Sequence, residues 1–223
     1  MTEKGSAMPN VFLHDQPVAV ANIFCIGRNY AAHAAEMGSI VETEPLVFLK
    51  PNSALCLSNQ PIILPDFSHE VHHEAELVLL IGKTAHNVSV ENALDYVAGY
   101  ALGLDLTARD TQSIAKQKGQ PWTKSKGFKN AACVSNFIMS EQLPNPNDVS
   151  FQLEVNGEIR QTAHTRLMAF SCAYLVSYLS EVYGLSAGDL IYTGTPEGVA
   201  KLNKGDAVML TMGTLLSAAW QVS

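Results

Sequence analysis

The chain has 223 residues, a net charge of −7 and a pI near 5.4. This length fits one large domain or two small ones. The acidic balance argues against a nucleic-acid partner, because phosphate contacts need clustered Lys and Arg. Hydrophobic residues make up 47% of the chain, which is enough for a core, yet no apolar run reaches the roughly 20 residues that span a bilayer.

The N-terminal segment MTEKGSAMPN lacks the charged-then-apolar pattern of a secretion signal, and the four cysteines are widely spaced. We therefore expect reduced thiols and a cytoplasmic protein with no membrane partner. The composition predicts a tail over residues 1–15, followed by a single domain over residues 16–223.

Short apolar runs that end at Gly or Pro predict strands at residues 18–26, 46–50 and 61–64. Between the first two, the Ala-rich segment 29–37 is predicted to be a helix that stops at Gly38. The run EAELVLLI at 74–81 is the strongest predicted strand. A helix at 89–96 with Ser89 as its N-cap, a strand at 100–107 and a short helix at 109–118 follow.

In the second half, FQLEVNGEIRQ at 151–161 is predicted to be a hairpin, because alternating residues flank an Asn-Gly turn. Residues 168–183 form the one long amphipathic pattern and predict a helix that ends at Gly184. The segments LSAGDLIYTG and LNKGDAVMLT each show a Gly-Asp turn before a strand. Many short strands without regular βαβ alternation predict an α+β fold that is mainly β.

Two carboxylates stand side by side at the start of the strongest strand. Glu74 and Glu76 are two residues apart, so in a strand they point to the same face. The apolar run that follows is typical of a strand buried on both faces, where two carboxylates repel each other and are poorly solvated. A cation between them would relieve both costs. The alternative is a solvated sheet edge.

A third carboxylate, Asp105, lies within the apolar segment YVAGYALGLDLTA. A buried Asp needs a charged partner or a metal, and an internal salt bridge to the nearby Arg109 is the alternative explanation. Three carboxylates without a cysteine suit a hard cation such as Mg²⁺ or Mn²⁺ better than zinc.

The histidine-rich segment before this strand, residues 69–73, matches the H-E-x-x-H signature of zinc proteases. That signature binds one ion only on a helix, where its two histidines share a face. Here it lies between a turn and a strand, where His69 and His73 would be about 13 Å apart. We therefore expect no zinc-protease site.

Several motifs follow one another in the order found in the fumarylacetoacetate hydrolase family. They are HHEAELVLLIGK, DLTARDTQ, PWTKSKGF, the Asn-Gly-Glu hairpin and IYTGTPEGV, and FCIGRNYAAHAAEMGS and PLVFLKPNSAL are also similar to that family. The resemblance spans about residues 20–215 and is closest to the small branch of acylpyruvases, fumarylpyruvate hydrolases and oxaloacetate decarboxylases. It implies a mixed β-sandwich roll, of the type of that family's C-terminal domain, and a homodimer.

The resemblance also implies roles for individual residues. It implies one Mg²⁺ or Mn²⁺ on Glu74, Glu76 and Asp105, in agreement with the acidic cluster. It assigns catalysis to His33, Glu36 and Lys126, and substrate binding to Arg28, Tyr30, Gln112 and Thr195. The i,i+3 spacing of His33 and Glu36 places them on one helix face, so Glu36 can orient and polarise His33.

The implied activity is cleavage of a C–C bond in an acylpyruvate such as acetylpyruvate or fumarylpyruvate, which yields pyruvate and a carboxylate. His33 would activate a water as general base and Lys126 would offset developing negative charge. Oxaloacetate decarboxylation, or isomerisation or hydration of a 2-oxo-diacid, passes through a similar enolate and is the alternative. A non-catalytic binder with a structural cation is a different class, which the His33–Glu36 pair and Lys126 disfavour.

Overall fold

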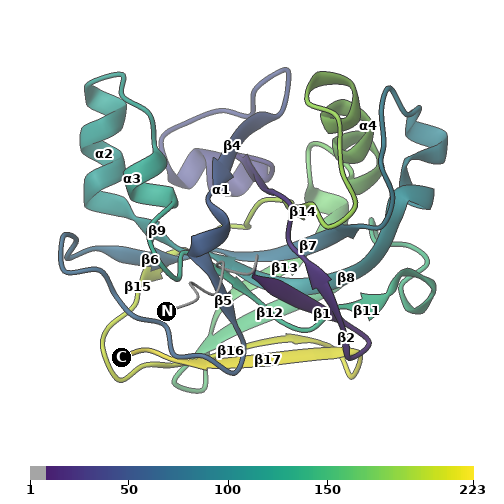
Figure 1. Cartoon of the computed structure of the whole chain (residues 1–223). Helices are drawn as coiled ribbons and strands as arrows, with labels where there is room; N and C mark the ends of the chain where they lie inside the picture. Colours follow the sequence, from purple (N-terminus) through teal and green to yellow (C-terminus); the bar gives the residue numbers. More distant parts are fainter. Residues whose placement is uncertain (1–8) are drawn as a thin grey trace, which may run out of the picture.

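Buried apolar strands build a large mixed sheet through the centre of the molecule (Figure 1). The structure is a computed structural model and describes residues 9–223. The strand order is β4-β3-β14-β7-β8-β10-β5, with β11 also paired to β8. The bounds are β3 (Ile23–Gly27), β4 (Leu46–Lys50), β5 (Leu55–Leu57), β7 (Ala75–Ile81), β8 (Val97–Asp105), β10 (Ala132–Val134), β11 (Ile138–Met139) and β14 (Leu190–Tyr192).

The antiparallel pair β7–β8 lies in the middle of this sheet and carries the acidic residues. Every residue of β7 is buried, as predicted for a strand covered on both faces. The β3–β14 and β5–β10 pairs are parallel, and the other pairings are antiparallel. The ends of β7 and β8 are therefore held from both sides by further strands.

A second sheet, in the order β13-β12-β16-β17, packs against β8 and closes the sandwich. Its strands are β12 (Ser150–Val155), β13 (Glu158–His164), β16 (Ala207–Met212) and β17 (Leu216–Gln221). Burial alternates along β12 and β17, because one face meets the core and the other meets solvent. The predicted Asn-Gly hairpin joins β12 to β13, and both turn residues have positive φ.

The helices lie on the other side of the large sheet (Figure 1). They are α1 (Ala31–Glu36), α2 (Arg109–Gln117), α3 (Thr123–Lys126) and α4 (Cys172–Val182), with 3₁₀ turns η1 (Asn52–Ala54), η2 (Val90–Tyr96), η3 (Ser140–Gln142) and η4 (Thr165–Leu167). Two small sheets complete the fold, β1–β2 (Asn10–Leu13, Gln16–Ala19) and β15-β6-β9 (Ala200–Lys201, Val71–His73, Thr107–Ala108). The mainly β, α+β sandwich roll predicted from the sequence is confirmed.

Several predicted boundaries are wrong. The strand expected over 18–26 is divided between β2 and β3, and residues 61–64 make one isolated bridge, between Ile62 and Val222, because prolines flank them. The helix expected at 89–96 is the 3₁₀ turn η2. The long helix begins at Cys172, because the Ser171 hydroxyl accepts the Tyr174 N–H and caps it there.

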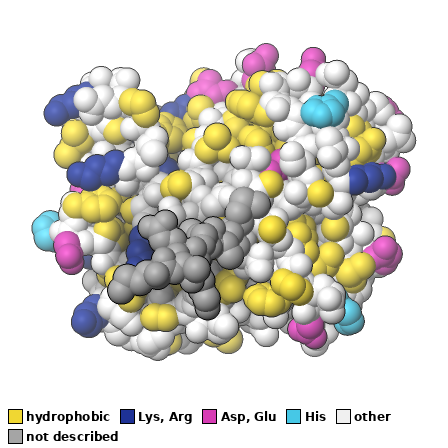
Figure 2. Space-filling model, viewed as in Figure 1, with side chains coloured by type: hydrophobic (Ala, Val, Ile, Leu, Met, Phe, Trp, Pro, Cys, Tyr) yellow, Lys and Arg dark blue, Asp and Glu magenta, His cyan; other side chains and the backbone are white. Residues whose placement is uncertain are grey.

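The predicted N-terminal tail is also wrong in part. Residues 10–13 form β1, which pairs with β2 and buries Val11 completely, whereas residues 1–8 lie outside the described residues. Within residues 9–223, no helix has the length and apolar character needed to cross a bilayer. On the face shown in Figure 2, basic side chains lie mainly on the side of α2, and acidic ones are spread along the other edges.

Candidate metal centre and active site

Three carboxylates meet where β7 begins and β8 ends. Glu74 precedes β7, Glu76 is its second residue and Asp105 is the last residue of β8. One oxygen from each lies within 4.8 Å of the others, and the three residues are only 4%, 1% and 1% exposed. The Asp105 N–H donates to the Glu74 carbonyl at 2.9 Å, which holds the two strand ends in register. The solvated sheet edge considered for Glu74 and Glu76 is therefore wrong.

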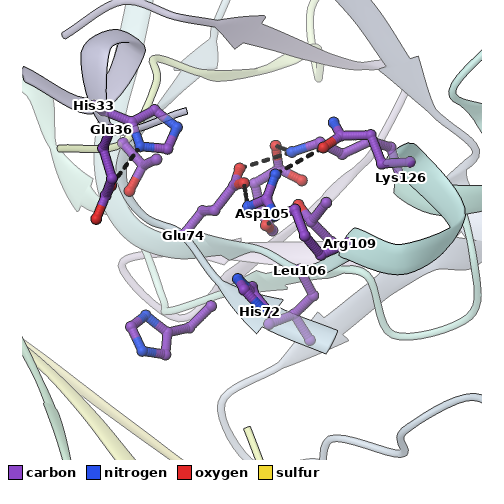
Figure 3. A network of polar contacts seen from close by, with 12 residues as sticks. His33, Glu36, His72, Glu74, Asp105, Leu106, Arg109 and Lys126 are labelled. Carbon is purple, nitrogen blue, oxygen red and sulfur yellow. Dashed lines mark hydrogen bonds and ion pairs between the residues drawn. The ribbon is translucent and has the colours of Figure 1, made fainter. Parts of the chain in front are cut away.

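Three basic side chains surround these carboxylates, two of which, Lys126 and Arg109, are labelled in Figure 3. Lys126 Nζ lies 2.7 Å from Glu74 Oε2 and 2.6 Å from Asp105 Oδ2. Arg109 pairs with Glu74 at 2.5 Å, and the fully buried Lys50 lies 2.7 Å from Asp105 Oδ1. Asp105 thus has internal salt bridges, but its partners are Lys50 and Lys126, and Arg109 pairs with Glu74 instead.

The carboxylates differ in their protonation. Burial opposes ionisation of Glu74, yet Lys126 and Arg109 more than offset it and hold its pKa well below the usual value. Burial, the Asp105 charge and the Glu74 charge raise the pKa of Glu76 well above the usual value. Burial would lower the pKa of Lys126, but Asp105 and Glu74 raise it, so Lys126 stays charged. Among residues 9–223, no basic side chain forms an ion pair with Glu76, unlike Glu74 and Asp105.

The site fits a divalent cation. Asp105 Oδ1 is buried and accepts no hydrogen bond from any described residue, because Lys50 approaches it outside hydrogen-bonding angles. Glu76 accepts a hydrogen bond from the Gly194 N–H at 2.7 Å. A cation among the three oxygens would satisfy Asp105 Oδ1 and favour ionised Glu76. An all-oxygen donor set suits Mg²⁺ or Mn²⁺.

The His33–Glu36 pair lies beside this centre on α1. His33 Nδ1 is 3.2 Å from Glu36 Oε2; His33 is buried, with 7% exposure, whereas Glu36 is exposed. Glu36 also accepts the Gly198 N–H at 3.1 Å, which fastens α1 to the loop after β14. Figure 3 shows the pair on one side of Glu74 and Lys126 on the other.

A cavity of about 40 Å³ joins these groups. Of the residues predicted from the sequence, it is lined by His33, Lys126, Glu74, Glu76, Asp105, Arg28, Gln112 and Thr195. Glu36 lies behind His33. Arg28 has a φ of 60°, which is rare for a residue with a side chain, and its guanidinium pairs with Glu42. Tyr30 does not line the cavity, and its buried hydroxyl has no hydrogen-bond partner among the described residues.

Sequence reasoning missed two residues of the site. Lys50, which ends the LVFLK strand, was not expected there, and for Arg109 the sequence suggests Asp105 as partner, whereas the structure pairs it with Glu74. A lysine at the end of an apolar strand was the available signal for Lys50, since a buried charge needs a partner. Which carboxylate each cation would reach could not be read from spacing, because the partners are far apart in sequence.

The H-E-x-x-H segment does not form a metal site in this fold. Its last three residues form β6, so the chain is extended there rather than helical. His73 is fully buried, and its Nδ1 lies 3.0 Å from Gln161 Oε1. Burial lowers the pKa of His73, so this histidine is neutral. The segment is thus not helical, as predicted from its place before a strand.

Comparisons with known proteins agree with this geometry. The model of the fumarylacetoacetate (FAA) hydrolase C-terminal family matches residues 22–223. The chain is 44% identical to oxaloacetate tautomerase FAHD1, mitochondrial, of Bos taurus, over 90% of this chain and 91% of that protein. It is 43% identical to the mitochondrial oxaloacetate decarboxylase of Dictyostelium discoideum, over 83% and 86%. The crystal structure of fumarylpyruvate hydrolase from Pseudomonas aeruginosa, in complex with Mn²⁺ and pyruvate, matches with a TM-score of 0.93, 35% identity and coverage of 100% and 98%.

Proposed function

Because the chain belongs to the fumarylacetoacetate hydrolase family, whose members among its relatives are enzymes, we propose that it cleaves a C–C bond in acylpyruvates in a reaction that depends on Mg²⁺ or Mn²⁺. One observation carries this proposal. Three buried carboxylates converge within 4.8 Å, and they share one cavity with His33 and Lys126. A small anionic 2-oxo acid suits a cavity that also contains the Arg28 and Arg109 side chains.

Glu74, Glu76 and Asp105 would hold the cation. When bound, it would act as a Lewis acid toward the 2-oxo group and carboxylate of the substrate. Lys126 stays charged and lies between Glu74 and Asp105, so it would offset negative charge that develops on the substrate.

His33 would act as general base. Its Nδ1 faces Glu36, which leaves Nε2 for a water in the cavity. The activated water would attack the distal carbonyl of the acylpyruvate. The bond between that carbon and the methylene would break, with its electron pair moving to the methylene carbon of the pyruvate unit. Protonation of that carbon would give pyruvate, and the acyl part would leave as a carboxylate.

A second candidate is enol–keto conversion or decarboxylation of oxaloacetate. The names of the two relatives favour it. Tautomerisation needs only proton transfer at the methylene carbon, which His33 could perform. Decarboxylation needs no attacking water, so it would depend less on His33.

The test is to assay acetylpyruvate, fumarylpyruvate and oxaloacetate with Mn²⁺ and Mg²⁺, using the wild type, Glu76→Gln and His33→Ala. We expect metal-dependent release of pyruvate from an acylpyruvate, loss of activity in Glu76→Gln, and a kcat that is about 10²- to 10⁴-fold lower in His33→Ala. No release of pyruvate from either acylpyruvate would refute the first candidate. CO₂ release from oxaloacetate that survives His33→Ala would favour the decarboxylase.

The homodimer and the cytoplasmic location stay predictions. Light scattering of the purified protein tests the first, because a dimer has twice the mass of the 24.1 kDa chain. Fractionation of the source cells tests the second.

A further inference from the structure

Gln161 is a buried polar residue that the proposed reaction does not use. It lies on β13 in the second sheet and is 2% exposed. Its amide reaches two other segments, the junction between β6 and β7 and the loop that follows β14. These two segments carry residues of the acidic site, although Gln161 itself does not line the cavity.

The acceptor end of Gln161 contacts both residues that flank Glu74, the backbone of one and the side chain of the other. Its Oε1 accepts the Ala75 N–H at 3.0 Å and lies 3.0 Å from His73 Nδ1. Because an amide oxygen can only accept, the His73 ring nitrogen is the donor in this contact. One oxygen therefore fixes both neighbours of a predicted metal ligand.

The donor end holds the loop after β14. Its Nε2 donates to Thr195 Oγ1 and to the Pro196 carbonyl, both at 2.9 Å. Thr195 lines the cavity, and the N–H of the preceding Gly194 donates to Glu76 at 2.7 Å. The same amide thus sets the position of the loop that binds the second carboxylate.

The amide matches these partners in number and kind. A glutamine side chain offers two N–H donors and two acceptor lone pairs, and all four are used here. Glutamate would have no donor for the loop, and an apolar residue would leave several buried groups without partners. The loop also lies tightly against β13, because a Cβ added to Gly198, whose φ is +92°, would come within 2.4 Å of the Arg160 carbonyl.

We propose that Gln161 is a positioning residue of the active site, which joins the Glu74 backbone to the loop that carries Gly194 and Thr195. It acts through these residues and touches neither the cation nor the substrate. Removing it would let the Glu74 and Glu76 carboxylates move relative to each other, which weakens cation binding. This consequence for the cation rests on the proposed function.

The test compares Gln161→Met, which keeps the side-chain length and removes every hydrogen bond, with Gln152→Met as control. Gln152 lies on the adjacent strand β12, and its amide donates to Glu154, away from the site. Calorimetry gives the Mn²⁺ affinity of the folded protein, and kcat and KM are measured in parallel. We expect Gln161→Met to weaken Mn²⁺ binding by about 10- to 100-fold, as losses of outer-shell partners do. The control should change it by no more than about twofold.

A metal-free measurement separates this proposal from the proposed function. Amide hydrogen exchange at Ala75 and Gly194 should become faster in metal-free Gln161→Met and stay unchanged in the control, because the Gln161 amide holds both segments. Wild type that neither binds Mn²⁺ nor turns over substrate would refute the proposed function, and the exchange rates would still decide the role of Gln161.

A merely structural role gives a different result. In that case Gln161→Met lowers the melting temperature, while Mn²⁺ affinity, kcat and the two exchange rates of the folded protein stay at wild-type values, and the proposal is overturned. If Gln161→Met does not fold, Gln161→Asn replaces it. This variant keeps an amide that is too short to reach both segments, and the same weakening of Mn²⁺ binding is expected.

Discussion

Replacing Glu76 with Gln should have opposite consequences with and without a cation. In the metal-free protein the pKa of Glu76 is raised well above its usual value by burial, by Asp105 and by Glu74, which favours its neutral carboxyl. Gln is also neutral and has almost the same shape, and its oxygen can still accept the Gly194 N–H. We therefore expect the metal-free free energy of unfolding of Glu76→Gln to differ from wild type by less than about 1 kcal/mol near pH 4, and the variant to be the more stable at pH 7, where unfolding lets Glu76 of the wild type ionise.

A bound cation should make the wild type more stable than Glu76→Gln. At a Mn²⁺ concentration about 1,000 times the dissociation constant, binding stabilises the wild type by about 4.1 kcal/mol. A chain of this size gains about 2–4 °C in melting temperature per kcal/mol, which gives about 8–16 °C. Loss of a direct ligand should weaken binding by at least about 100-fold. The same Mn²⁺ concentration then stabilises Glu76→Gln by about 1.4 kcal/mol, or about 3–6 °C.

Thermal unfolding followed by circular dichroism, with and without Mn²⁺, measures all four states. Glu154→Gln is the matched control, because Glu154 lies on β12 in the second sheet and should leave the Mn²⁺ shift at its wild-type value. A Glu76→Gln protein that keeps the full Mn²⁺ shift would refute the assignment of Glu76 as a ligand. A metal-free variant that is several kcal/mol less stable would refute the neutral state of Glu76.

Four further predictions follow from buried charges and from the backbone. Lys50→Met should lower the free energy of unfolding in urea by about 3–5 kcal/mol, because it leaves a buried carboxylate with one cation fewer. Mn²⁺ affinity should rise with pH, because ligands must be deprotonated and Glu76 has a raised pKa; calorimetry in buffers of different ionisation enthalpy should detect the released proton. As pH rises, the metal-free wild type should also lose stability relative to Glu76→Gln. Because its folded-state pKa is raised, Glu76 contributes stability that is complete below its unfolded-state pKa and is lost as pH rises through its folded-state pKa. Gly188→Ala should cost about 1–3 kcal/mol or more in the same urea titration, because Gly188 has a φ of +91° and a Cβ there would lie 2.2 Å from the Ala19 carbonyl.

Three of these predictions have a matched control variant. Lys204→Met, at an exposed lysine, should change stability by less than about 0.5 kcal/mol, and an equal loss would mean that the buried ion pair is not the cause. Glu76→Gln should release no proton on exposure to Mn²⁺. Gly213→Ala tests backbone strain alone, because φ is +53° and no atom lies within 4 Å of the added Cβ, and it should cost about 1–2 kcal/mol.

Patterns local in the sequence predicted the parts of the fold that depend on short-range physics. The continuous apolar run after Glu74 predicted the doubly covered strand β7, and the Asn-Gly turn predicted the β12–β13 hairpin. Boundaries were less certain where a local preference competed with tertiary contacts. The segment around Ile62 has strand-forming residues, but its flanking prolines cannot donate to a ladder.

In the candidate site, too, some residues could be predicted from local sequence patterns and others could not. Spacing along one strand was enough to place Glu74 beside Glu76, and the apolar surroundings of Asp105 were enough to require a partner for it. The resemblance to a family supplied His33, Glu36 and Lys126, which spacing alone could not single out. The structure brings His33 and Lys126 to one cavity with the three carboxylates, and it leaves Glu36 and Tyr30 outside the lining.

The amino-acid sequence by itself determined which residues carry charge and which must be buried, because hydrophobic patterning and side-chain chemistry are local properties. Only the tertiary structure decided which charges meet. Lys50 reaches Asp105 across 55 positions of the chain, and Gln161 reaches Ala75 across 86. Such contacts depend on how strands from distant segments pair and how the two sheets pack, and no periodicity in the sequence encodes that arrangement.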